Sequence, residues 1–142
     1  MSERKKKVLV TGAEGVIGTA VREFLSDKYD LSSLTFTPQD FPSHVGNIAD
    51  FEQIRPAFDG MDAVVHLAAS SDIETPWEDV LNNNLIGTYN VFEAARQAGV
   101  KTMVYASSNH AMGMYEIDGK PELYEVNDPR TYDHTVEIRP DS

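Results

Sequence analysis

Three glycines near the start of the chain have the spacing of a phosphate-binding turn. Gly12, Gly15 and Gly18 follow a short apolar run and precede a helical pattern of apolar residues. Without a β-carbon the backbone can approach a phosphate, and the free N–H groups and the positive end of the helix dipole attract the anion. The order of strand, glycine turn and helix therefore predicts a dinucleotide site, with a purely structural turn as the alternative.

Two further polar turns follow apolar runs later in the chain. Residues 68–71 come after the run 63–67, and residues 107–110 come after the run 102–106. The second turn carries hydroxyl, amide and imidazole groups, which can hydrogen-bond a substrate or take part in proton transfer. The alternative is that its two serines only end a strand.

The elements that must position these turns alternate along the chain, and we expect four strands and three helices. The strands are expected at residues 7–11, 34–37, 63–67 and 102–106. The helices are expected at residues 16–28, 51–60 with Asp50 as its cap, and 76–99. Loops are expected at residues 39–47 and 70–75, and mostly irregular structure at 111–142.

This alternation predicts an α/β fold, a doubly wound parallel sheet of the Rossmann type with strand order 3-2-1-4. We expect one NAD(P)-binding domain over residues 1–142, incomplete at its C-terminus, with residues 1–6 as a flexible lead-in. The carboxyl ends of parallel strands meet at one edge of such a sheet. The glycine turn and the two polar turns should therefore converge on one crevice.

The composition narrows the class of protein. The chain of 142 residues has a formal net charge of −11 and no cysteine. The acidic balance argues against nucleic-acid binding, and the lack of cysteine excludes disulfides and thiolate metal sites. No apolar run is long enough to cross a membrane, so we expect a cytoplasmic protein without a metal or a membrane partner. The acidic surface serves solubility or, alternatively, adaptation to high salt.

Four landmarks resemble the extended short-chain dehydrogenase/reductase superfamily, in its NAD-dependent epimerase/dehydratase group. They are Thr11-Gly12-x-x-Gly15-x-x-Gly18, His66-Leu67-Ala68-Ala69, Asn84-x-x-Gly87-Thr88 and Tyr105-Ala106-Ser107-Ser108. The turn of residues 107–110 most resembles that of uronate dehydrogenases and related NAD-dependent sugar or sugar-phosphate dehydrogenases. The resemblance implies an oxidoreductase that uses NAD to oxidise a sugar, a uronate or a sugar phosphate at C1 to a lactone.

The resemblance also implies roles for individual residues. Ser108 matches the catalytic serine that hydrogen-bonds the reacting oxygen of the substrate. Substrate contacts are implied for Ser71, Ser108, Asn109 and His110, the last two at the acid or phosphate end of the sugar. Asn84 matches a helix asparagine near the active site, whereas Asn82 and Asn83 are expected to be solvent-exposed polar residues of an amphipathic helix. Cofactor contacts are implied for Gly12, Gly15, Val16, Ile17, Gly18, Asn47, Ile48, Leu67, Ala68, Ala69 and Asn84, with Asn47 and Ile48 against the adenine.

The sequence departs from the family pattern where the ribose of NAD is expected. An acidic residue belongs ~20 residues after the glycines, but Thr37, Pro38 and Gln39 stand near that point and Asp40 is the nearest acid. No lysine or arginine lies between Leu31 and Arg55 to bind the 2′-phosphate of NADP. NAD is therefore favoured as the cofactor, with NADP not excluded.

A second departure concerns catalysis. The superfamily uses a Tyr-x-x-x-Lys pair to move the substrate proton as hydride passes to the nicotinamide, but none of the six tyrosines here is followed by lysine four positions later. We therefore expect this chain to be inactive alone and to be the first part of a longer enzyme, which could form a homo-oligomer. Two other classes stay open: a nucleotide-sugar epimerase or dehydratase, and a non-catalytic nucleotide-binding protein.

Overall fold

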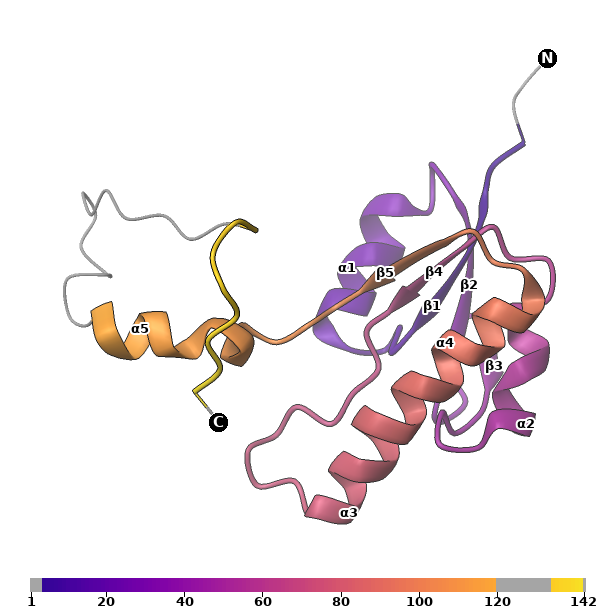
Figure 1. Ribbon diagram of the computed structural model, residues 1–142. Helices are drawn as coiled ribbons and strands as arrows, with labels where there is room; N and C mark the ends of the chain where they lie inside the picture. Colours follow the sequence, from indigo (N-terminus) through magenta and orange to yellow (C-terminus); the bar gives the residue numbers. More distant parts are fainter. Residues whose placement is uncertain (1–3, 120–133, 142) are drawn as a thin grey trace. The chain divides into compact units, whose positions relative to one another are not determined.

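The chain forms two compact units, Met1–Ala106 and Ser107–Ser142. The computed structural model describes residues 4–119 and 134–141. The first unit is built on a parallel five-stranded sheet in the order β3-β2-β1-β4-β5 (Figure 1). Its strands are β1 Lys7–Thr11, β2 Asp30–Thr35, β3 Ser43–Val45, β4 Ala63–His66 and β5 Thr102–Tyr105.

The sheet confirms the doubly wound parallel fold and the order 3-2-1-4, and it adds a fifth strand. The position next to β2 at the sheet edge is occupied by β3, which pairs with the end of β2. β3 lies within the stretch 39–47, which was expected to be a loop. The strand expected third along the chain is β4, and it pairs with β1. The strand order therefore reverses between β1 and β4, where ligands bind in folds of this class.

The second strand lies further towards the N-terminus than the expected range of 34–37. β2 begins at Asp30 and ends at Thr35, and it pairs with β1 from Lys7 opposite Asp30 to Thr11 opposite Leu34. The first half of β2 is mostly polar, so no run of apolar residues reveals where the strand begins. Backbone pairing with β1 determines its position instead.

Helices cover both faces of the sheet (Figure 1). Helix α1, Val16–Leu25, lies on one face. Helix α2 Phe51–Ile54, the 3-10 helix η1 Arg55–Phe58 and helix α4 Gly87–Ala98 lie on the other. The main core is under this second group and consists of Leu9, Leu34, Ile48, Ile54, Phe58, Val64, Val91, Ala94 and Ala95.

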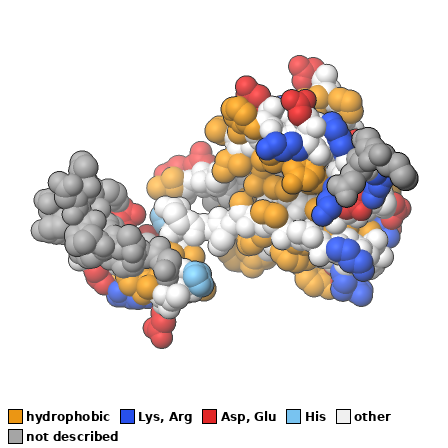
Figure 2. Space-filling view, turned by 90° about the horizontal axis from the view of Figure 1, so that it is seen from above, with side chains coloured by type: hydrophobic (Ala, Val, Ile, Leu, Met, Phe, Trp, Pro, Cys, Tyr) orange, Lys and Arg blue, Asp and Glu red, His pale blue; other side chains and the backbone are white. Residues whose placement is uncertain are grey.

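Helix α1 is shorter than expected and leaves much of its apolar surface open. It ends at Leu25 rather than Lys28, because the amides of Lys28 and Tyr29 both donate to the Leu25 carbonyl at 3.0 Å. Val16 is 91% exposed, while Gly18 is buried. Apolar side chains reach the surface of the first unit among acidic and basic ones (Figure 2).

The long helix expected over residues 76–99 is continuous but changes its winding. It consists of α3 Trp77–Asp79, the π-helical segment η2 Val80–Ile86 and then α4. Gly99 ends it in the left-handed conformation at φ 73°, as a glycine C-cap does. The π-helical segment follows the loop after β4, and such segments occur frequently at functional sites.

The second unit contains the 3-10 helix η3, Asn109–Met112, and helix α5, Gly113–Gly119. The amide of Met114 donates to the carbonyl of Arg139 at 3.1 Å, which joins this helix to the described residues 134–141. The expectation of mostly irregular structure at 111–142 was wrong for residues 113–119, which form helix α5. Residues 120–133, which share that expectation, lie outside the described residues.

Candidate functional site

The carboxyl ends of the parallel strands in the first unit meet at one edge of the sheet. Thr11, the last residue of β1, is in register with Leu34 of β2 and with His66 of β4. The glycine turn begins directly after Thr11, and residues 67–71 follow directly after His66. Two of the three turns that were expected to converge therefore share this edge.

The glycine turn packs closely against the backbone that follows β4. Gly12 has a left-handed φ of +67°, and a β-carbon there would lie 2.8 Å from the amide nitrogen of Ala68. A β-carbon on Gly18 would overlap the Gly12 carbonyl oxygen. Gly15 has an ordinary φ of −71° and is exposed, and a β-carbon there would lie 3.3 Å from the same oxygen, a tight contact that a small shift would relieve. Gly12 and Gly18 therefore permit backbone packing, whereas Gly15 lies on the open side of the turn.

Helix α1 presents its amino end at this turn. Gly15 is the N-cap residue, and the Thr19 amide donates to its carbonyl at 2.8 Å to form the first helical hydrogen bond. The amides of Val16, Ile17 and Gly18 precede that bond and carry the partial positive charge of the helix end. An anion such as a pyrophosphate suits this position.

Thr11 and His66 form a buried hydrogen-bonded pair beneath the turn. The Thr11 hydroxyl lies 2.7 Å from Nδ1 of His66, and the amides of Leu67 and Ala68 donate to its oxygen at 3.2 Å each. Nε2 of His66 lies 3.2 Å from the hydroxyl of Thr88 at the start of α4. His66 is 1% exposed, and this burial lowers its pKa to about 4. Its imidazole is therefore neutral at about pH 7.

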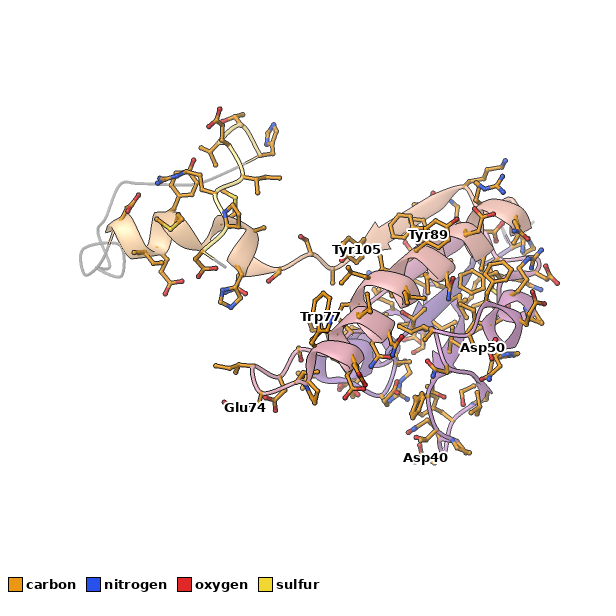
Figure 3. All side chains as sticks on the ribbon, turned by 60° about the horizontal axis from the view of Figure 1, so that its bottom comes forward. Asp40, Asp50, Glu74, Trp77, Tyr89 and Tyr105 are labelled. Atoms are coloured by element: carbon orange, nitrogen blue, oxygen red, sulfur yellow. The ribbon has the colours of Figure 1, made fainter. Side chains whose placement is uncertain are left out.

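Aromatic rings cover one face of His66. The Tyr105 ring of β5 stacks on the imidazole with the centroids 5.6 Å apart, and Phe92 of α4 meets Tyr105 edge-on at 5.8 Å. Tyr105 lies beside α4 (Figure 3). These rings help to keep water from the imidazole, which favours its neutral form.

Two consecutive asparagines of η2 hold the loop after β4. Oδ1 of Asn84 accepts from the Ser70 amide at 2.7 Å, and its Nδ2 donates to the Ser70 carbonyl at 2.9 Å. Nδ2 of Asn83 donates to the Ser70 hydroxyl at 2.9 Å. Asn83 was expected to be a solvent-exposed polar residue, but its side chain contacts this loop. Asn84 fixes the backbone next to the exposed Ser71.

Asn47 and Ile48 follow β3 and are held by contacts within the protein. Oδ1 of Asn47 accepts from the Ala49 amide at 2.9 Å. Ile48 is 9% exposed and belongs to the core, and its carbonyl accepts from Asn90 at 2.9 Å. Asp50 caps α2 as expected, accepting from the Gln53 amide at 3.2 Å. The loop expected against adenine is therefore tied down by hydrogen bonds within the protein, with the Ile48 side chain packed in the core.

The fold brings to the loop after β2 a cation, Arg22, that lies outside the stretch from Leu31 to Arg55 in the sequence. Nε of Arg22 in α1 donates to the Ala13 carbonyl at 3.0 Å, and its guanidinium carbon lies 3.5 Å from the centre of the Phe41 ring. Asp40 lies at the outer end of the same loop (Figure 3). Arg22 thus links the glycine turn to the region where the ribose of a dinucleotide is expected.

The turn with Ser108, Asn109 and His110 lies in the second unit and has its own partners there. The Ser108 hydroxyl accepts from the His110 amide at 3.2 Å, and Asn109 is exposed. Nδ1 of His110 lies 2.9 Å from a carboxylate oxygen of Asp141, whose amide donates to the His110 carbonyl at 3.3 Å. Sequence reasoning missed Asp141, because 31 residues separate it from His110.

Two kinds of feature are absent from residues 4–119 and 134–141. The helices described there are too short or too polar to cross a membrane. The histidine and acidic side chains of the same residues form no cluster of three that could hold a metal ion.

Sequence comparison relates the chain to known enzymes. The family described as NAD dependent epimerase/dehydratase matches residues 8–135. The NAD-dependent glucose-6-phosphate dehydrogenase of Haloferax volcanii is 38% identical over 94% of this chain and 55% of its own length. The uronate dehydrogenase of Pseudomonas syringae pv. tomato is 32% identical over 89% of this chain and 47% of its own length. The chain thus spans about half the length of the curated relatives it matches.

Structural comparison agrees with these relatives. A variant of the uronate dehydrogenase from Agrobacterium tumefaciens, solved as a complex with NAD, superposes with a TM-score of 0.70 and 36% sequence identity. The superposition covers 75% of this chain and 42% of that one.

Proposed function

The chain belongs to the NAD-dependent epimerase/dehydratase family, and on that premise we propose that it forms the cofactor-binding part of an NAD-dependent sugar dehydrogenase. The proposed reaction oxidises a sugar, a uronate or a sugar phosphate at C1 to a lactone. In this reaction C1 loses a hydride and its hydroxyl loses a proton as the carbon–oxygen double bond forms. When bound, NAD would supply the oxidant that accepts the hydride.

The geometry of the glycine turn carries this proposal. Gly12 and Gly18 let the turn pack against the backbone of Ala68 and Ala13, where a β-carbon would clash, and this packing places the turn directly before the amino end of α1. The amides at the start of α1 would hold the pyrophosphate, because the helix end is positive and Gly15 adds no side chain. Leu67, Ala68 and Ala69 would line the same edge of the sheet beside the turn.

NAD is the proposed cofactor rather than NADP. The guanidinium of Arg22 is already engaged by the Ala13 carbonyl and the Phe41 ring. Asp40 on the same loop would repel a 2′-phosphate. Fluorescence titration with NADH and NADPH tests this choice, and tighter binding of NADPH would contradict it. Arg22→Gln tests the role of the cation, since we expect it to leave the preference for NADH unchanged.

The second unit supplies the proposed substrate contacts. Ser108 would hydrogen-bond the reacting oxygen, and Asn109 and His110 would bind the acid or phosphate end of the sugar. The Asp141 carboxylate lies 2.9 Å from Nδ1 of His110 and orients the imidazole, so that Nε2 is the ring nitrogen left for the substrate. Ser71 in the first unit is proposed as a further substrate contact.

Turnover and binding together test the function. The sequence holds no Tyr-x-x-x-Lys pair, so we expect the 142-residue chain to bind NADH but not to reduce NAD. NADH absorbance with glucuronate, glucose 6-phosphate and UDP-sugars measures turnover. Formation of NADH that depends on a sugar would contradict the expected inactivity, and a lack of NADH binding would contradict the proposed function itself.

The same substrates distinguish the other functions when applied to the natural gene product. Oxidation of a free uronate or sugar phosphate supports the dehydrogenase. Conversion of a UDP-sugar instead indicates an epimerase or dehydratase. NAD binding without any turnover indicates a nucleotide-binding protein that is not an enzyme.

A further inference from the structure

Thr11, His66 and Thr88 form a connected set, here called the Thr11–His66–Thr88 network, that joins β1, β4 and α4. The direction of its hydrogen bonds follows from the chemistry of the Thr11 hydroxyl, which has one hydrogen and two lone pairs. The Ala68 amide donates to one lone pair, and the Leu67 amide donates to the other while it also donates to the Thr11 carbonyl at 3.3 Å. The hydroxyl hydrogen of Thr11 is therefore donated to Nδ1 of His66.

The tautomer of His66 follows from that bond. Because Nδ1 accepts, the proton of the neutral imidazole is on Nε2, and it is donated to the hydroxyl of Thr88. A proton on Nδ1 would point at an oxygen whose lone pairs are already used. The network thus has one arrangement that satisfies all its members, as a buried polar network requires.

The network controls the backbone against which the glycine turn packs. Thr11 is bonded to the two amides that follow β4, and the Ala68 amide nitrogen is the nearest atom to the missing β-carbon of Gly12. A displacement of the segment containing Leu67 and Ala68 would therefore press on Gly12 or leave a gap beside it. Interiors packed this closely transmit such shifts.

The same network extends to the loop after β3 through α4. Gly87, next to Thr88, has no room for a side chain, because a β-carbon there would lie 2.7 Å from Cδ1 of Ile48. Asn90, one helical turn from Gly87, donates to the Ile48 carbonyl. The start of α4 therefore ties both segments proposed to contact the cofactor, residues 67–69 and residues 47–48, to one helix.

We infer that the Thr11–His66–Thr88 network positions the nucleotide site by holding Leu67 and Ala68 against Gly12 before any ligand binds. The inference rests on the proposed binding of a nucleotide at the glycine turn. It goes beyond that proposal because it attributes part of the protein's affinity for the nucleotide to side chains that have no proposed contact with it. Their effect is preorganisation, since ordering the loop in advance removes that cost from binding.

Thr11→Val tests the network with little change in side-chain volume. The variant removes the hydroxyl, so the Ala68 amide loses its acceptor and His66 loses its donor. We expect the Kd for NADH to rise about fivefold to tenfold, the range that one lost hydrogen bond explains. Thr11→Ser restores the hydroxyl and should bind NADH within about twofold of wild type.

Val64→Ala is the matched control for a general loss of stability. Val64 lies on β4, two residues before His66, and it is fully buried in the core without a polar side-chain atom. The variant should unfold more easily and yet bind NADH with the wild-type Kd. If it weakens binding as much as Thr11→Val does, the inference is wrong, because stability alone then sets affinity.

Two measurements without nucleotide report on the network directly. Nitrogen NMR of wild type should show the His66 proton on Nε2, and Thr11→Val should shift this tautomer equilibrium. Amide exchange at Ala68 should be faster in Thr11→Val and restored in Thr11→Ser. A wild-type protein that does not bind NADH would overturn the proposed function. Wild-type binding in Thr11→Val with unchanged exchange at Ala68 would overturn the network alone.

Discussion

At the scale of single residues, the buried imidazole of His66 makes folding stability depend on pH. Burial lowers its pKa from 6.5 to about 4 in the folded protein. The unfolded chain therefore binds a proton more readily between these two values. The stabilising contribution of neutral His66 is complete above about pH 6.5 and decreases as the pH falls towards 4.

We therefore predict that wild type loses stability on acidification and that His66→Asn loses less. Between about pH 7.5 and pH 5.5 the difference in the free energy of unfolding should be on the order of 1 kcal/mol. Urea denaturation at both values measures it. His44→Asn is the control, because the ring of His44 is only half-buried. Parallel pH dependence in wild type and His66→Asn would show that another group is responsible.

Two glycines of the turn should respond differently to the same substitution. Gly18→Ala forces a methyl group against the Gly12 carbonyl and should cost about 1–3 kcal/mol of stability, as overpacking does. Gly15→Ala makes a milder contact, 3.3 Å from the same oxygen, and puts the methyl group where phosphate is proposed to approach. We expect Gly15→Ala to retain stability within about 1 kcal/mol and to bind NADH more than about tenfold more weakly. Thermal unfolding and calorimetric titration test the pair, and normal NADH binding by Gly15→Ala would place the phosphate elsewhere.

The sequence predicted the glycine turn, but it did not predict the side-chain contacts that support the turn. The spacing of Gly12, Gly15 and Gly18 is a local signal that one stretch of chain contains. The contact between Thr11 and His66 joins residues 55 positions apart, so no spacing within either segment indicates it. The link from Arg22 to Phe41 is hidden in the same way, because tertiary packing creates it.

At the scale of elements, the π-helical winding of η2 lets neighbouring asparagines act on one loop. Asn84 makes two hydrogen bonds to the backbone of Ser70. We predict that Asn84→Ala lowers the free energy of unfolding by about 1–2 kcal/mol and speeds amide exchange at Ser70. Asn82→Ala is the matched control, because Asn82 is exposed in the same segment. Equal effects of the two variants would mean that the hydrogen bonds from Asn84 to Ser70 contribute nothing to stability.

The same elements show where sequence patterns fail. The apolar pattern placed the long helix correctly, but it could not reveal the π-helical winding that brings Asn83 towards Ser70. Strand β3 is three residues long, lies at the sheet edge and is not fully buried, so it has no alternating pattern to detect. The expected range of β2 was wrong because pairing with β1 extends the strand over residues 30–33, which are polar except for Leu31.

At the scale of the whole molecule, alternation of strands and helices was sufficient to predict the fold. The parallel sheet and its strand order follow from short right-handed crossovers, which few topologies satisfy. The division after Ala106 could not be predicted, because residues 107–110 continue the pattern of a strand followed by a polar turn. Contacts between Met114 and Arg139 and between His110 and Asp141 define the second unit, and no local pattern encodes them.

The net charge of the whole chain leads to a prediction about salt. A charge of −11 makes the folded state repel itself more than the expanded unfolded chain does. The Debye length falls from about 10 Å at 0.1 M salt to about 3 Å at 1 M, so potassium chloride screens this repulsion. Exposed ion pairs such as Arg96–Glu93 are screened too, but such pairs contribute little to stability. We expect the free energy of unfolding in urea to rise up to about 1 M potassium chloride and then to level off. Stability independent of salt would contradict the prediction, and a rise that continues at the same slope to about 3 M would indicate exclusion of salt from the surface instead.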